Sequence, residues 1–139
     1  MCLTLAIELP TMSIEEAKRI ARTGSSGIID VNFVGTTSLL GRSNPRLSIS
    51  ELGEGCACSM LTDEADWNAP EWDIRPELLP HIANALAFIC EQAPNGVVLE
   101  ALWAGDKLDA TIELSLEELT IIVMANRLST KAKYIVTLP

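Results

Sequence analysis

Apolar and polar residues alternate in several stretches of the chain. Near the N-terminus, apolar side chains fill every second position from Leu3 to Leu9, and near the C-terminus the same period covers 133–138. Because the side chains of a strand point alternately to its two faces, this period predicts a half-buried β-strand at each place. Shorter stretches predict further strands, at 28–34, 47–52, 97–103 and 108–114. The stretch 56–61 is either another strand or the far side of a bulge.

Three helices are predicted from helical periodicity and from their start signals. Ser13 and Ser115 each stand three residues before a glutamate, which is the spacing of a capping box. The helix after Ser115 is apolar nearly all round over 119–125, so we expect it to be buried on more than one side. Pro76 and Pro80 predict an irregular first turn over 75–79 for the remaining helix. Its core face comprises Ile82, Leu86, Ile89 and Ala93, with Cys90 at the margin.

These elements predict an α+β fold. We expect one mixed sheet of about six strands with three helices packed mainly on one face, and a single compact domain over residues 1–139. The turn at 104–107 is of the length that joins a hairpin, which would pair 97–103 with 108–114. The stretch 35–46 is rich in turn-forming residues and predicts a loop.

The charge of the chain excludes some classes of partner. It has 10 basic and 19 acidic residues, a net charge of −9. A general nucleic-acid binder needs a basic surplus to neutralise phosphates, and an anionic membrane attracts basic segments, so neither partner is expected. The N-terminus lacks the basic start of a secretory signal, and no apolar run approaches the roughly 20 residues of a membrane span. We therefore expect a cytoplasmic protein with reduced thiols.

The acidic residues are concentrated in the middle of the chain. Residues 47–118 contain fifteen acidic residues and two basic ones. A solvated acidic region that aids solubility is one interpretation. The other is a surface for a cationic partner, which would associate faster at low salt.

The segment 56–75 is the strongest candidate for binding. It is a long, acidic stretch with two tryptophans, and tryptophan is a frequent interface anchor. The predicted binding residues are Trp67, Trp72, Asp63, Asp66 and Asp73. Carboxylates beside aromatic rings suit a basic or cationic ligand. The alternative is that the two indoles fill the edge of the core.

Two cysteines and the single histidine form a second candidate site. In the predicted strand at 56–61, Cys56 and Cys58 would share one face, and its extended geometry would leave their sulfur atoms too far apart for an unstrained disulfide. A bend at Gly55 and the addition of His81 would give a zinc site with one open position. The alternative is that both cysteines are small buried residues.

The sequence resembles no family, and its function remains a set of alternatives. We expect a non-enzymatic, acidic interaction or ligand-binding domain that uses 56–75 to bind a basic protein or a cationic ligand, with a homodimer left open. The alternative is a thiol- or metal-dependent protein that uses Cys56 and Cys58 with or without His81, and zinc is the cofactor that this pattern suggests. An acid–base enzyme is supported by no motif.

Overall fold

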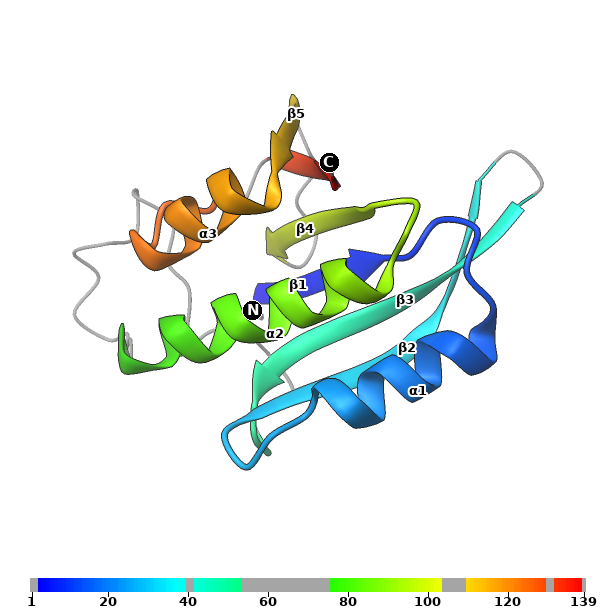
Figure 1. Ribbon diagram of the computed structural model, residues 1–139, viewed down its shortest axis with the longest axis horizontal. Coiled ribbons are helices and arrows are strands. Elements are labelled where there is room, and N and C mark those ends of the chain that lie inside the picture. Colours follow the sequence, from blue (N-terminus) through cyan, green and yellow to red (C-terminus); the bar gives the residue numbers. More distant parts are fainter. Residues whose placement is uncertain (1–2, 40–41, 54–75, 104–109, 130–131, 139) are drawn as a thin grey trace.

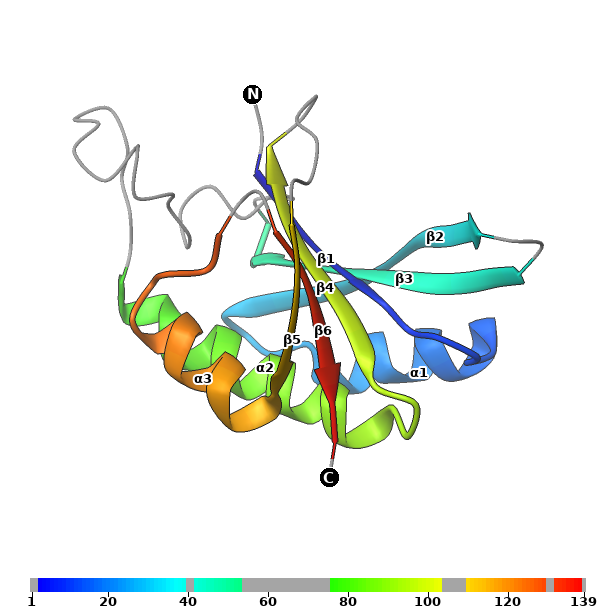
Figure 2. The ribbon, with the colours of Figure 1, turned by 90° about the horizontal axis from the view of Figure 1, so that it is seen from above.

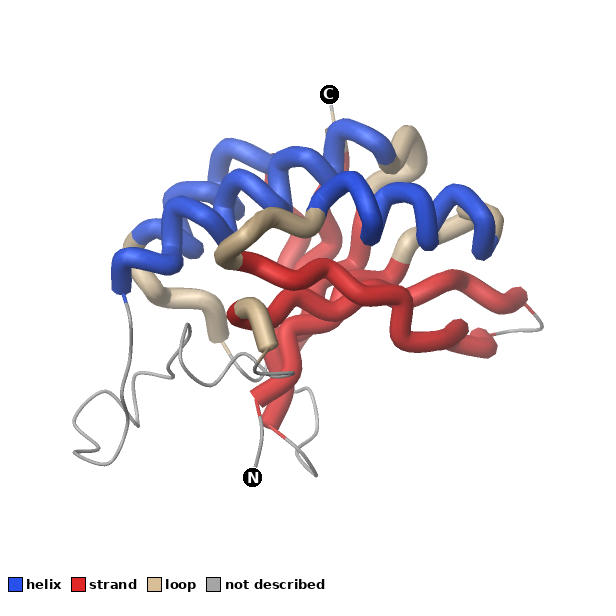
Figure 3. The backbone as a smooth tube through the Cα atoms, turned by 90° about the horizontal axis from the view of Figure 1, so that it is seen from below, coloured by secondary structure: helices blue, strands red, loops and turns tan. Residues whose placement is uncertain are grey.

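The computed structural model describes residues 3–39, 42–53, 76–103, 110–129 and 132–138. Six strands form one mixed sheet, and three helices lie together on one face of it (Figures 2 and 3). This arrangement confirms the predicted α+β fold. The elements in chain order are β1 (Leu3–Glu8), α1 (Ile14–Gly24), β2 (Ile29–Leu39), β3 (Arg42–Glu51), the 3₁₀ helix η2 (Pro76–Leu78), α2 (Leu79–Gln92), β4 (Val97–Trp103), β5 (Ala110–Ser115), α3 (Leu116–Met124) and β6 (Ala132–Thr137).

The order of the strands corrects one prediction. The order in the sheet is β2-β3-β1-β4-β6-β5, so β6 lies between β4 and β5 (Figure 2), and the predicted hairpin between 97–103 and 108–114 is wrong. Figure 1 shows β2, β3, β1 and β4 side by side. β5 instead pairs with β6 in parallel, from Ala110 opposite Ala132 to Ser115 opposite Thr137. Parallel neighbours need a crossover connection, and α3 lies in that connection. The local pattern could not reveal this pairing because β6 comes later in the chain.

The predicted loop over 35–46 is also wrong, because β2 extends to Leu39 and β3 begins at Arg42, so all of its described residues lie in a long antiparallel strand pair. Thr36 lies opposite Pro45, and Leu39 lies opposite Arg42. The register shifts between Phe33 and Thr36, and Gly35 within this shift has a φ of 111°. A bulge of this kind lets turn-forming residues stay inside a strand pair.

The core lies between the sheet and the helices. Leu5 and Ile7 of the central strand β1 are fully buried, as are Ile20 of α1 and Ile82 of α2. The irregular start of the second helix is confirmed, since η2 precedes α2. Its predicted core face is confirmed too, and Cys90 is buried with it. None of the described helices is both long and apolar enough to cross a bilayer.

α3 is buried along one side only, so the prediction for this helix was wrong. Leu119 and Val123 are buried against the rest of the core, whereas Ile121 is 64% exposed and Met124 is 46% exposed. α3 packs against α2, β5 and β6. Within the described part of the chain no element covers its other side. The apolar residues of this helix therefore lie partly in the core and partly on the surface of the protein.

Candidate functional site

Most residues of the two predicted sites lie outside the described residues. These are Trp67, Trp72, Asp63, Asp66, Asp73, Cys56 and Cys58. His81 is described, and it lies half-buried in the first turn of α2. In the ranges that the structure describes, no three histidine, cysteine or acidic side chains are grouped so as to hold a metal ion. The zinc site and the tryptophan site therefore stay predictions.

The one cysteine in the described ranges is Cys90, and it is not a candidate nucleophile. Burial in the core, and then the neighbouring carboxylate of Glu91, raise the pKa of its thiol to about 11. At neutral pH the thiol is protonated, and the thiolate is the reactive form of cysteine. Cys90 therefore acts as a small apolar residue of α2.

His81 lines a small cleft between the end of α1, the start of β2 and α2. The cleft has a volume of about 260 Å³, with Ile29 and Phe88 among its apolar lining. His81 and Asn84 lie one helical turn apart at this cleft. The hydroxyl of Ser25 is already engaged, because it accepts a hydrogen bond from the N–H of Val31 at 2.9 Å. The cleft is thus a small polar depression over an apolar base.

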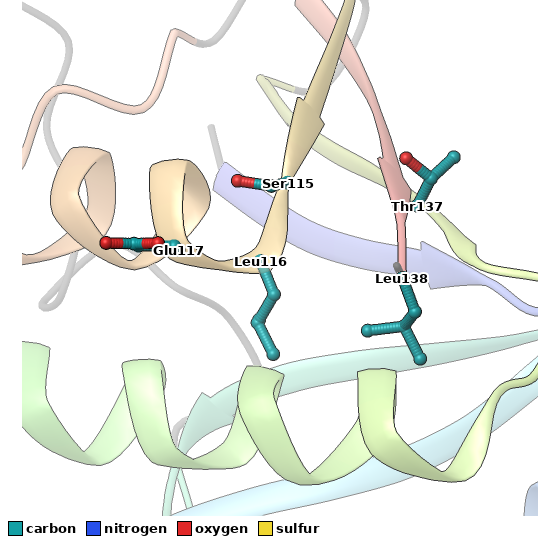
Figure 4. Close-up of a pocket in the computed structure, with 5 residues that line it drawn as sticks. All are labelled: Ser115, Leu116, Glu117, Thr137 and Leu138. Carbon is teal, nitrogen blue, oxygen red and sulfur yellow. The ribbon is translucent and has the colours of Figure 1, made fainter.

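A larger cavity lies where β5 and β6 end and α3 begins. Its volume is about 650 Å³, within the range of roughly 300–1,000 Å³ that is usual for ligand pockets. Because β5 and β6 run in parallel, their C-terminal ends meet at the same edge of the sheet. Figure 4 shows the side chains of Leu116 and Leu138 directed toward α2 and that of Ser115 toward α3, while Glu117 lies on α3 itself, away from the two leucines. The cavity is lined by Ser115, Leu116, Glu117, Thr137 and Leu138.

A capping box fixes the start of α3 beside this cavity. The Ser115 hydroxyl accepts a hydrogen bond from the N–H of Glu118 at 3.1 Å, and the Glu118 carboxylate accepts one from the N–H of Ser115 at 3.1 Å. The carboxylate of Glu118 is therefore used within the helix start. Glu117 is exposed, and no hydrogen bond or ion pair joins it to another described residue. Its charge is therefore exposed on α3, at the border of the cavity.

Two carboxylates elsewhere in the described ranges, those of Glu16 and Glu100, are paired with bases. On the sheet face opposite the helices, Glu100 lies 3.6 Å from the Arg46 guanidinium and 3.7 Å from the Lys133 ammonium. In α1, Arg19 lies 2.9 Å from Glu16. These three bases therefore already have carboxylate partners.

β5 and α3 together have the opposite character. Residues 110–124 contain three glutamates, at positions 113, 117 and 118, and no basic residue. All three are exposed. Three of the seven large hydrophobic side chains exposed in the described ranges also lie here, namely Ile112, Ile121 and Met124. We define the β5–α3 surface as Ile112, Glu113, Glu117, Ile121 and Met124 together with the adjoining cavity.

Sequence reasoning did not select this surface, although one signal for it is present. No basic residue occurs between Lys107 and Arg127, and four acidic residues do. The exposure of Ile121 could not be recognised from the sequence, because an apolar helix gives the same pattern whether one side or two are covered.

The surface combines an apolar wall with a free carboxylate. Such a combination suits a side chain with an aliphatic stem and a cationic end, because the stem packs on apolar groups while the charge stays near a counter-charge.

No model of a protein family matches this chain, and neither a curated protein nor a solved structure is significantly similar to it.

Proposed function

We propose that this protein is a non-enzymatic binding domain that recognises a basic segment of a partner protein through its β5–α3 surface. The observation that carries the proposal is the cavity that Leu116 and Leu138 line, with Glu117, whose carboxylate is exposed and unpaired among the described residues, also in its lining. Around it lie exposed hydrophobic side chains and acidic residues, with no base in residues 110–124.

Apolar contact would supply most of the affinity of such a complex. Burying one aliphatic side chain contributes about 1.5–3 kcal/mol, whereas an exposed ion pair contributes at most about 1 kcal/mol. The glutamates would instead select a cationic partner and speed its association. Binding should therefore weaken as salt is added, without being lost entirely.

The tryptophan segment remains a sequence-based hypothesis beside this proposal. Trp67, Trp72 and the aspartates around them would serve the same class of basic partner, and they lie outside the described residues. The thiol- or metal-dependent alternative depends on Cys56 and Cys58 and is a matter for metal analysis of protein purified without chelator. Neither hypothesis is favoured by an observation on the described residues.

The test uses a short fluorescent peptide that alternates lysine and valine, with a glutamate–valine peptide as the charge control. We expect the lysine peptide to bind at low salt, and E117Q to weaken binding several-fold. E15Q is the matched control, because Glu15 is also exposed and lies in the first turn of α1, which packs on β2 and β3 at the other end of the sheet. Equal binding of the two peptides, or equal effects of the two variants, would contradict the proposal.

One further variant separates this surface from the tryptophan segment. If W67A abolishes binding of the lysine peptide in a folded protein while E117Q leaves it unchanged, the recognition surface is the one predicted from the sequence, and the present proposal is wrong. If E117Q weakens binding and W67A does not, the β5–α3 surface is supported.

A further inference from the structure

β5 is the last strand of the sheet, and its outer side has no strand partner in the part of the chain that the structure describes. Four consecutive residues, from Ala110 to Glu113, are exposed, including side chains on both faces of the strand. The outer side of an edge strand presents unpaired N–H and C=O groups, which are a template for another strand.

The two edges of the sheet differ in how well they are protected. β2, at the other edge, contains the register shift at Gly35, and such a bulge disturbs the edge for a new strand. β5 pairs with β6 over six consecutive residues without any shift. Its sequence contains no proline, lysine or arginine, which are the residues that usually protect an edge. Among the described strands, β5 is therefore the edge that is open to strand addition.

We infer that the basic segment binds as an extended strand along the free edge of β5. This inference rests on the proposed function, from which it takes the positive charge of the partner. Residues of an added strand opposite Ile112 would share its face of the sheet, toward the helices, and residues opposite Glu113 would share the other face. The segment recognised should therefore alternate aliphatic and basic residues.

A second copy of this chain fits the same edge less well. A twofold axis that places Ile112 opposite its own counterpart would also place Glu113 of both copies on the same face of the joined sheet. Two carboxylates would then lie near one another with no base from residues 110–124 to offset them. Like charges in an interface are repulsive, so a basic partner is the better occupant.

Amide hydrogen exchange of the protein with and without the lysine–valine peptide tests the inference. In a strand, alternate residues direct their N–H groups to opposite sides. We expect the β5 amides that point away from β6 to exchange at least tenfold more slowly when the peptide is bound, while the intervening ones change little. Two peptides, N-methylated either at every lysine or at every valine, should differ, one binding and the other not.

A pair of matched variants tests the same edge from the protein side. Ile112 and Ile28 are each 40% exposed, and Ile28 lies outside β5. We expect I112K to lower the affinity for the peptide at least tenfold, because a lysine on the edge opposes a basic strand, and I28K to leave it unchanged. Equal effects of the two variants would overturn the inference.

The remaining outcomes separate this inference from the proposed function. If the peptide binds with the E117Q effect but the β5 amides keep their exchange rates, the proposed function stands and strand addition is wrong. If the peptide does not bind at low salt, both are wrong. If the β5 amides become protected as the protein alone is concentrated, a second copy occupies the edge and the basic partner is wrong.

Discussion

Ile112 of β5 lies directly opposite Tyr134 of β6, yet Ile112 is 40% exposed and Tyr134 is only 2% exposed. The two side chains share one face of the sheet, so their difference comes from position. β6 has a strand on each side, whereas β5 has a described neighbour on one side only. Ile112 is thus an apolar residue that lies at the surface. It identifies the edge of the sheet where we propose that a partner binds.

Tyr134 also fixes the connection that leads into β6. Its phenolic oxygen accepts a hydrogen bond from the N–H of Ser129 at 2.8 Å. We expect Y134F to lower the free energy of unfolding by about 1–2 kcal/mol, because the Ser129 N–H loses this acceptor while the ring still packs. Urea unfolding measures the change. An unaltered midpoint would show that the hydrogen bond adds nothing to stability.

Gly96 precedes β4 and lies against the backbone of β6. Its φ is 79°, and a Cβ added there would lie 2.6 Å from the carbonyl oxygen of Val136. We expect G96A to destabilise the fold by about 1–3 kcal/mol, since both the backbone conformation and the close approach disfavour a side chain. Gly27 is the control, because a Cβ there meets nothing within 4 Å. Thermal unfolding should show G27A close to the wild type, and similar losses in both variants would contradict this explanation.

The capping box of α3 should contribute measurably to stability. We expect S115A to cost about 1 kcal/mol, because the N–H of Glu118 loses its acceptor at the helix start. S115D keeps a good capping group and should retain most of the stability. The two variants are compared by chemical unfolding. A loss as large in S115D as in S115A would indicate that Ser115 matters for packing beside the cavity rather than for capping.

The buried thiol of Cys90 gives the stability a dependence on alkaline pH. Burial raises its pKa from 9.0 to about 11 in the folded protein, so the unfolded chain loses this proton first as pH rises. The stabilisation is complete below pH 9 and is lost between pH 9 and pH 11, by an amount of about 3 kcal/mol. Unfolding of the wild type and of C90A, followed across this range, should converge by about that amount. Parallel curves would contradict the assignment.

Local signals account for the parts of the fold that the sequence predicts correctly. Ser13 and Ser115 cap α1 and α3 at the positions that their spacing to a glutamate predicts, and at Ser115 the full capping box is formed. Pro76 and Pro80 likewise account for the 3₁₀ turn ahead of α2. A proline disturbs the helical hydrogen bonds of the preceding turn only, so its effect can be predicted from nearby residues. Signals of this kind need only a few neighbouring residues.

The parts that could not be predicted depend on residues far apart in the chain. β5 pairs with β6 although the whole of α3 separates the two strands in the chain. Nothing in the local sequence of β5 distinguishes this pairing from a hairpin with β4. The exposure of Ile121 depends in the same way on which elements pack beside α3. The candidate surface could not be predicted from the sequence, because its exposure depends on how distant elements pack around it.

The most direct test of the proposed function is to map the bound lysine–valine peptide by backbone NMR chemical shifts. We expect the largest shift changes over β5 and α3, residues 110–124, and at the cavity residues Thr137 and Leu138. Changes concentrated instead at the cleft of His81 and Asn84, with none over β5 and α3, would contradict the proposal.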